Sequence, residues 1–95
     1  MSNDTGARIA FQFQARDVNL VMGPAKKAST VRFRVLLDGE IAAAAHGADV
    51  DAEGNGTLVQ QRMYQLIRQP GAIHDRRFEI EFLEAGAEVF CFTFG

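Results

Sequence analysis

Residues 77–94 read Arg-Phe-Glu-Ile-Glu-Phe-Leu-Glu-Ala-Gly-Ala-Glu-Val-Phe-Cys-Phe-Thr-Phe, and this stretch decides the fold. Its first half alternates apolar side chains with glutamates, and its second half places phenylalanine at every second position from residue 90 to residue 94. A period of two is typical of a β-strand that buries one face. Ala85-Gly86 separates the two halves, and a short turn between two alternating runs predicts a β-hairpin.

The same alternation recurs nearer the N-terminus, over residues 7–14, 17–22 and 31–38. Gly23-Pro24 and Asp38-Gly39 are turn signals that follow two of these runs. All eight phenylalanines lie in alternating segments, and we expect every one of them to face inward. Because a fully buried Phe contributes about 1.5–3 kcal/mol of transfer free energy, these rings are predicted to supply much of the core. The phenylalanines are residues 11, 13, 33, 78, 82, 90, 92 and 94.

Two segments in the middle of the chain are ambiguous. Residues 41–45 are too few for an independent helix and predict a short strand or an irregular crossing. Residues 57–69 fit a helical stripe and a bulged strand equally well. With five or six short strands between Gly, Pro and Asp turns, the sequence predicts an all-β fold, a small antiparallel β-sandwich that is jelly-roll-like. We expect residues 7–95 to form this single domain and residues 1–6 to be a flexible leader.

The composition excludes several classes of function. A chain of 95 residues makes one domain. Its net charge of −2 lacks the basic footprint of nucleic-acid-binding proteins, so no nucleic-acid partner is expected. No apolar run approaches the roughly 20 residues of a membrane-spanning helix. The single cysteine, Cys91, excludes an internal disulfide and a Cys-x-x-Cys redox pair.

No constellation of catalytic residues stands out. Cys91 lies between two phenylalanines, and no residue near it in the sequence would make its thiol reactive, so we interpret it as a packing residue. His46 and His74 have no second ligand at a zinc-binding spacing, and we interpret them as surface loop histidines. The sequence therefore predicts a protein that is not an enzyme and that needs no cofactor.

The sharpest short motif is the acidic loop of residues 49–56, Asp-Val-Asp-Ala-Glu-Gly-Asn-Gly. Asp49, Asp51 and Glu53 match positions 1, 3 and 5 of an EF-hand calcium loop, and glycine follows at position 6. The match then degrades, because Gly56 stands at position 8 in place of an apolar residue and Gln60 stands where the loop needs a bidentate glutamate. Two interpretations remain open. One is a weak calcium site that stabilises a ligand- or protein-binding β-module, and the other is an acidic loop whose side chains bind their own backbone.

Polar side chains on the solvent faces of the expected strands offer a surface for a carbohydrate or a protein ligand. Amides and guanidinium groups suit hydroxyl-rich ligands, and polar residues are also expected on the wet face of any antiparallel sheet. The chain has no Trp and a single Tyr to serve as an aromatic platform. The candidates for this surface are Gln12, Gln14, Asn19, Arg32, Arg34 and Tyr64.

Five segments together resemble the C-terminal domain of DipZ-like proteins, which are thioredoxin-family members associated with thiol–disulfide exchange and cytochrome c biogenesis. The closing Phe-x-Phe-Thr-Phe-Gly of residues 90–95 is the most distinctive of the motifs. The segments are residues 11–24 (FQFQARDVNLVMGP), 31–39 (VRFRVLLDG), 62–68 (RMYQLIR), 78–83 (FEIEFL) and 89–95 (VFCFTFG).

This resemblance implies a β-sandwich with the fold of a carbohydrate-binding module, and it favours strand over residues 57–69. It also implies a thioredoxin-like domain upstream in the same parent chain, where the redox cysteines of that family lie. An extracytoplasmic location, in the periplasm or cell envelope, follows from the same resemblance. The chain itself would be a non-catalytic accessory module that positions partners or ligands for the thiol–disulfide domain.

Overall fold

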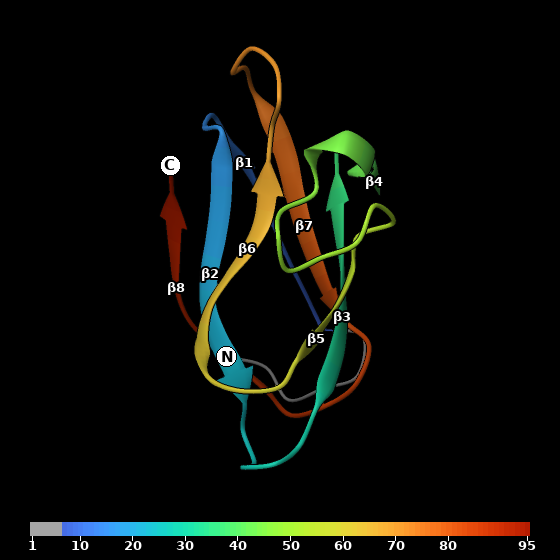
Figure 1. The fold of residues 1–95 in the computed structure, drawn as a ribbon, viewed down its shortest axis with the longest axis vertical. Helices are drawn as coiled ribbons and strands as arrows, with labels where there is room; N and C mark the ends of the chain where they lie inside the picture. The colour runs from blue at the N-terminus through green and yellow to red at the C-terminus, as the bar shows by residue number, and fades with distance from the viewer. Residues whose placement is uncertain (1–6) are drawn as a thin grey trace.

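The computed structural model describes residues 7–95 as two antiparallel β-sheets packed face to face, which confirms the predicted all-β sandwich (Figure 1). The expected leader, residues 1–6, lies outside the described residues. The molecule measures 39 × 21 × 21 Å. The elements are β1 (Arg8–Phe13), β2 (Asp17–Pro24), β3 (Val31–Leu37), β4 (Glu40–Ile41), the 3₁₀ turn η1 (Ala43–Ala45), β5 (Asn55–Leu58), β6 (Arg62–Arg68), β7 (Arg76–Phe82) and β8 (Ala87–Phe94).

Five strands form one sheet and three form the other. The larger, sheet A, has the order β1-β7-β3-β4, with β5 also paired to β3. The smaller, sheet B, has the order β6-β2-β8. The part of the chain that the structure describes contains no helix long enough to cross a membrane.

The core lies between the inner faces of the two sheets and is built from the alternating apolar residues. In sheet A, Phe33 lies opposite Phe82 in the register, and both are almost completely buried. In sheet B, the inward residues of β2 are completely buried. Sealing such rings away from water is the main driving force for folding in a domain of this size. The largest buried side chains are Tyr64, Phe33, Phe78, Phe82, Leu20, Met22, Leu58, Leu66, Ile67 and Ile80.

The predicted hairpin of residues 77–94 is wrong. β7 pairs with β1 and β3 in sheet A, whereas β8 pairs with β2 in sheet B, so the chain crosses between the sheets at Ala85-Gly86. The backbone hydrogen bond from Leu83 N to Arg32 O holds the end of β7 beside β3. Beyond the turn, Gly86 O accepts a hydrogen bond from Ala25 N, which directs the chain to the end of β2.

Four of the eight phenylalanines are buried and two, Phe11 and Phe92, are partly buried against the core, whereas the remaining two are exposed, against the prediction. The register between β2 and β8 shifts between Val21, opposite Cys91, and Met22, opposite Val89. This β-bulge leaves Phe90 as the extra residue, with 54% of its surface exposed. Phe94 is 50% exposed at the end of β8, where its ring still stacks on Phe13.

The ambiguous middle of the chain is strand and irregular structure. Residues 41–45 end β4 and form η1, as the interpretation of an irregular crossing predicted. Residues 57–69 contain the end of β5 and all of β6, so the strand alternative is confirmed. The expected bulge is present opposite Val18 and Asn19, and it allows two consecutive residues of β6, Leu66 and Ile67, to be buried together.

Candidate functional site

A groove on the outer face of sheet A brings together residues from two separate predictions. Arg32 and Arg34 come from the surface candidates, and Asp51 and Glu53 come from the acidic loop. The groove consists of two adjoining hollows, with volumes of about 420 Å³ and about 280 Å³, which share Arg34 and Asn55. We call this the β3–β5 groove. Its polar lining residues are Arg32, Arg34, Asp51, Glu53, Asn55 and Thr57, and its apolar lining residues are Phe33, Leu36, Ile41 and Leu83.

The register of β3 and β5 places the polar side chains of the groove. Arg32 lies opposite Thr57, and Arg34 lies opposite Asn55. Directly opposite residues of an antiparallel pair point to the same side of the sheet, so these four side chains form two polar rows on the outer face. Phe33, between the two arginines, points inward and is completely buried. The groove therefore offers hydrogen-bonding groups but no exposed aromatic ring.

Arg34 is the arginine of the groove that forms no ion pair within the described residues. Glu81, which lies opposite Arg34 on β7, forms an ion pair of 2.8 Å with Arg8 instead. Among residues 7–95 no carboxylate lies within ion-pair distance of Arg34. Arg32 is different, because its Nη2 lies 3.3 Å from Glu84 Oε2. The guanidinium of Arg34 is thus free to donate its planar fork of N–H groups to a ligand.

Glu84 is held at the edge of the groove by the backbone as well as by charge. Its Oε1 accepts a hydrogen bond of 2.8 Å from Arg32 N. This hydrogen bond, more than the charge of Arg32, lowers the pKa of Glu84 below its ordinary value. The Arg32–Glu84 pair is therefore ionised at neutral pH.

The acidic loop lines the groove because of a tight turn centred on Asp51. Asp51 Oδ1 accepts hydrogen bonds from Glu53 N at 3.0 Å and from Asn55 N at 2.9 Å. Gly54 has a φ of +87°, and a Cβ built on it would lie 2.1 Å from Val35 O. Only glycine lets the loop approach β3 so closely, and Gly54 O accepts a hydrogen bond of 2.7 Å from Val35 N.

Asp49 serves a structural contact at the other end of the loop. Its Oδ1 accepts a hydrogen bond of 2.8 Å from Arg62 Nη2, and its Oδ2 accepts one of 2.7 Å from Gln65 N. The hydrogen bond from Arg62 is the main reason why the pKa of Asp49 lies below its ordinary value. Asp49 therefore fastens the acidic loop to β6 of sheet B.

The three carboxylates proposed for calcium are not arranged as one ligand set. The oxygens of Asp49 bind Arg62 and Gln65, while Asp51 Oδ1 caps its own turn. Glu53 lines the β3–β5 groove instead. Over residues 7–95 no group of three or more His, Cys, Asp or Glu side chains is placed to hold a metal ion. Of the three carboxylates, only Asp51 binds the backbone of its own loop.

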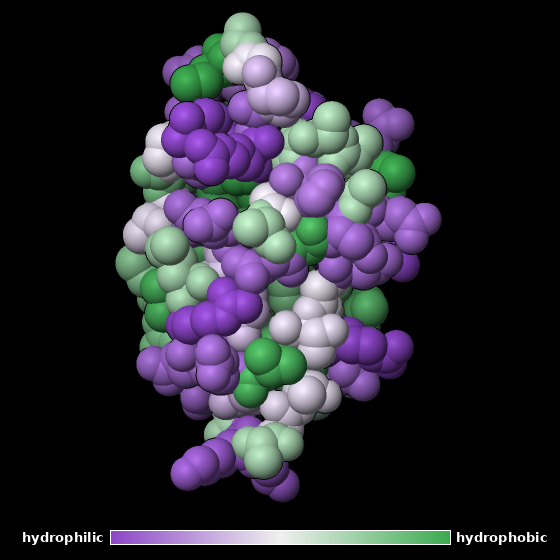
Figure 2. Space-filling model, in the orientation of Figure 1, coloured by the Kyte–Doolittle hydropathy of each residue, from purple (hydrophilic) through white to green (hydrophobic). Residues whose placement is uncertain are grey.

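The remaining surface candidates are scattered over the molecule. Gln12 is exposed on β1, on the outer face of sheet A but two strands away from β3, and Gln14 is exposed beyond the end of β1. Asn19 lies on the outer face of sheet B, opposite Gln65. Figure 2 shows mainly hydrophilic residues on the face that it draws, with hydrophobic ones scattered among them. Of the six candidates, only Arg32 and Arg34 meet in one site.

Tyr64 is not a surface residue, which corrects the sequence-based expectation. Its side chain is buried, with 1% of its surface exposed. Its hydroxyl donates to Gln60 O at 2.7 Å and accepts from Val59 N at 3.1 Å. Tyr64 therefore fixes the turn between β5 and β6 from inside the core, and it offers no platform to a ligand.

The single described serine, the cysteine and the two histidines lie on different elements of the fold. Ser29, the single serine among residues 7–95, lies in the loop before β3, at the opposite end of the sandwich from η1 and the loop before β7 (Figure 1). His46 and His74 follow η1 and precede β7, and the Nδ1 of each lies within hydrogen-bond distance of a neighbouring backbone carbonyl. Cys91 is exposed on β8. The hydrogen bonds of His46, His74 and Cys91 in the described chain go to backbone carbonyls and not to one another.

Two residues of the groove, Asn55 and Thr57, were missed by the sequence analysis. They alternate with Gly56 along β5, and this alternation was the available signal. It was hidden because residues 49–56 were interpreted as one acidic loop and residues 57–69 as one ambiguous element. The boundary between these two segments falls in the middle of β5.

Solved structures with a similar fold belong to larger proteins. A family two carbohydrate esterase from Clostridium thermocellum, solved in complex with cellohexaose, superposes with a TM-score of 0.67 at 13% sequence identity, covering 99% of this chain and 26% of the esterase chain. A family two carbohydrate esterase from Cellvibrio japonicus superposes with a TM-score of 0.57 at 12% identity, covering 99% of this chain and 28% of that one. The chain thus spans about a quarter of each esterase chain, and at such identities the likeness shows the fold alone.

Comparison with protein families gives a direct match, whereas no curated protein matches the chain. The family model described as the thioredoxin-like C-terminal domain matches residues 1–95. That match covers the whole chain, in agreement with the resemblance drawn from the closing Phe-x-Phe-Thr-Phe-Gly and the four strand segments before it. The chain therefore belongs to the thioredoxin-like C-terminal domain family.

Proposed function

We propose that the chain is a non-catalytic accessory module that positions a partner or ligand for an adjacent thiol–disulfide domain of a DipZ-like parent protein. The observation that carries this proposal is the family match over residues 1–95. It is supported by the separation of Ser29, Cys91 and the two histidines in the fold. In such a parent protein, the module would act in the periplasm or cell envelope, where disulfide exchange takes place.

The arrangement of the side chains in the two sheets supports a ligand-binding function more than a catalytic one. The apolar side chains of the two sheets are sealed against each other, and the polar groups of the β3–β5 groove lie on a rigid sheet face. Side chains held on strands present a ligand with a preformed arrangement, which lowers the entropic cost of binding. The module would therefore contribute affinity and orientation, while the thiols of the neighbouring domain carry out the exchange.

The experiment compares the natural parent protein with a version that lacks residues 7–95. We expect both to reduce a small aromatic disulfide at rates within twofold of each other, because the module holds none of the reacting groups. In cells without the natural gene, only the complete protein should restore the redox state of extracytoplasmic thiol proteins, measured by thiol labelling and mass spectrometry. A parallel fall in small-disulfide turnover, or full restoration by the truncated protein, would contradict the proposal.

A carbohydrate is the second candidate for the ligand, and the β3–β5 groove favours it. Arg34, Asp51 and Asn55 bring a guanidinium, a carboxylate and an amide to one shallow surface. Groups of this kind hydrogen-bond to the hydroxyls of a sugar ring. The esterase from Clostridium thermocellum, which shares the fold, was solved with cellohexaose. Because the only aromatic residue in the groove is buried, hydrogen bonds would have to provide most of the affinity.

Titration of the chain with cellohexaose, followed by amide chemical shifts, tests the carbohydrate candidate. We expect shifts confined to β3, β5 and the acidic loop, and at least fivefold weaker binding in Arg34→Gln. Arg77→Gln is the matched control, because Arg77 is exposed on β7 of the same sheet and does not line the groove. Absence of shifts at millimolar cellohexaose, or equal effects of the two substitutions, would exclude this use of the groove.

A further inference from the structure

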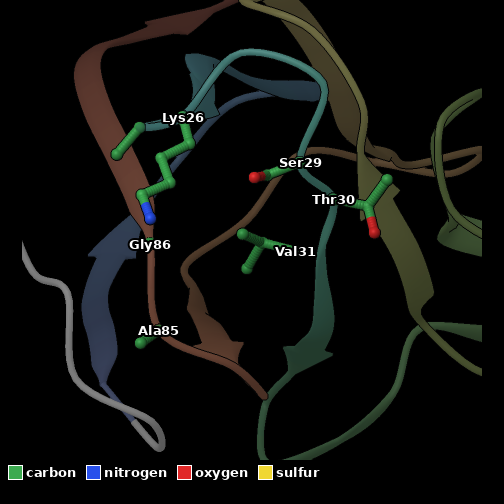
Figure 3. A pocket seen from close by; sticks show the side chains of 7 residues that line it. Lys26, Ser29, Thr30, Val31, Ala85 and Gly86 are labelled. Carbon is green, nitrogen blue, oxygen red and sulfur yellow. The ribbon is translucent and has the colours of Figure 1, made fainter.

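Another hollow, separate from the β3–β5 groove, lies at the end of the sandwich where the loop between β2 and β3 meets the crossing from β7 to β8 (Figure 3). Its volume is about 450 Å³. The hydrogen bond from Ala25 N to Gly86 O, at 2.7 Å, joins the two segments beside it. We call this hollow the Lys26 pocket. Its lining residues are Ala25, Lys26, Ser29, Thr30, Val31, Ala85 and Gly86.

The Lys26 pocket has an unbalanced positive charge. Lys26 and Lys27 are the only lysines of the chain, whose net charge is −2, and both lie in this loop. Within residues 7–95 neither forms an ion pair, and no lining residue is acidic. The acidic residue next to the lining, Glu84, is occupied by Arg32. An ammonium group with no carboxylate partner favours an anionic ligand.

The side chains divide the pocket into a polar part and an apolar part. Figure 3 shows the ammonium group of Lys26 beside Gly86 and the hydroxyl of Ser29 directed into the pocket, whereas the hydroxyl of Thr30 points away. Ala85 provides the apolar part, whereas Val31 lines the pocket but is almost completely buried. A charge, a hydroxyl and a small apolar surface would bind the acid group, a hydroxyl and the C–H face of one ligand.

We propose that the Lys26 pocket binds the carboxylate of a small hydroxylated acid of the sugar-acid class. The carboxylate would lie against the ammonium group of Lys26, and Ser29 would hydrogen-bond to a ring hydroxyl. The volume of about 450 Å³ lies in the range of small-molecule sites and is much larger than an inorganic anion needs. An extended peptide fits less well, because most lining residues lie in loops and Val31, the first residue of β3, is already paired with Leu58 of β5.

This site is separate from the β3–β5 groove, with which it shares no lining residue. The inference therefore goes beyond the proposed accessory function. It also assigns a use to the polar loop before β3, whose residues take part in none of the ion pairs of the described chain.

The first test uses two glycosides that differ only in the acid group. Methyl β-D-glucuronide and methyl β-D-glucoside are titrated into the chain at low ionic strength, and amide chemical shifts are followed. We expect the glucuronide alone to shift the residues of the Lys26 pocket, with binding that weakens as salt is added. Three results would overturn the proposal. They are equal shifts from both glycosides, acetate that binds as strongly as the glucuronide, and no shifts when the glucuronide is raised from 20-fold the protein concentration to about 20 mM.

The second test uses the two adjacent lysines as a matched pair. Lys26→Gln and Lys27→Gln change the net charge equally and lie in the same exposed loop, but only Lys26 lines the pocket. We expect at least fivefold weaker glucuronide binding in Lys26→Gln and less than twofold in Lys27→Gln. Equal losses would show a diffuse charge effect and overturn the proposal. Arg34→Gln should leave glucuronide binding unchanged, so failure here is distinguishable from failure of the groove.

Discussion

Replacing Phe78 and Phe90 by alanine, one at a time, distinguishes the structure from the simple alternating pattern. The pattern assigns both rings to the core, whereas the structure buries Phe78 completely and leaves Phe90 54% exposed at the bulge of β8. Phe78 also contacts two other rings, with centroids 5.2 Å from Phe11 and 5.7 Å from Phe92. The two substitutions remove the same atoms from very different environments.

The expected costs differ by several kcal/mol. A fully buried Phe replaced by Ala costs about 3–5 kcal/mol of unfolding free energy, because a cavity is left in addition to the lost transfer energy. For Phe90 about half of the side chain is already in water, so the cost should be about 1 kcal/mol or less. Urea unfolding followed by far-UV circular dichroism measures both values.

Equal costs for Phe78→Ala and Phe90→Ala would refute the reasoning, because they would mean that the bulge is absent and that β8 alternates regularly. A cost of 3–5 kcal/mol is a large part of the stability of a small domain, which is about 5–15 kcal/mol. If Phe78→Ala does not fold at all, Phe78→Leu provides the comparison. It keeps most of the buried volume and should still cost more than Phe90→Leu.

Three further predictions follow from the acidic loop. The hydrogen bond from Arg62 lowers the pKa of Asp49, so its contribution to stability is complete above about pH 4 and is lost as pH falls through the lowered folded-state value. Asp49→Asn should therefore reduce the fall in unfolding free energy between pH 5 and pH 2, measured by urea titrations, and an unchanged fall would contradict this role. Gly54→Ala should lower the melting temperature by more than 5 °C, because the Cβ of the alanine would clash with Val35 O. Gly39→Ala is the milder control, because a Cβ at that position meets nothing within 4 Å. Millimolar calcium should leave the melting temperature unchanged, because the oxygens of Asp49 are already bound; a rise of several degrees would favour the calcium module instead.

Much of the fold could be predicted because strand alternation is local information. The alternation of Arg32, Phe33 and Arg34 alone indicates which side of β3 faces water, and the structure agrees. The pairing partners could not be predicted in this way, since alternation specifies a face and not a neighbour. Residues 77–83 and 88–94 read as a hairpin, yet backbone contacts at Leu83 and Gly86 direct them into different sheets.

The bulges are the second limit of the sequence analysis. A bulge adds an extra residue that leaves the regular alternation of its strand, and its position depends on the register of the partner strand. Phe90 is exposed for this reason, although its alternation with Phe92 is regular in the sequence. In β6, the doublet Leu66-Ile67 indicated a bulge, because two adjacent apolar residues cannot both face inward from a regular strand that has one solvent-exposed face.

Only part of the β3–β5 groove could be predicted from the sequence. Outward-facing arginines on β3 could be found from the pattern, but their meeting with Asp51 and Asn55 depends on the return of the acidic loop to the edge of β3. That return requires the left-handed Gly54 and the turn capped by Asp51. Tyr64 was misplaced because the sequence gives no signal that its hydroxyl is satisfied by the backbone inside the core.

Turnover of a small disulfide by the proposed DipZ-like parent protein carrying Cys91→Ser is the most direct test of whether this domain performs chemistry of its own. Cys91 holds the only thiol of the chain, and it lies exposed on β8 with its Sγ 3.5 Å from Phe92 O. If the domain only binds and positions, the rate should remain within twofold of the unmodified protein. A loss of tenfold or more, with the domain still folded, would show that its thiol takes part in the exchange and would contradict the account.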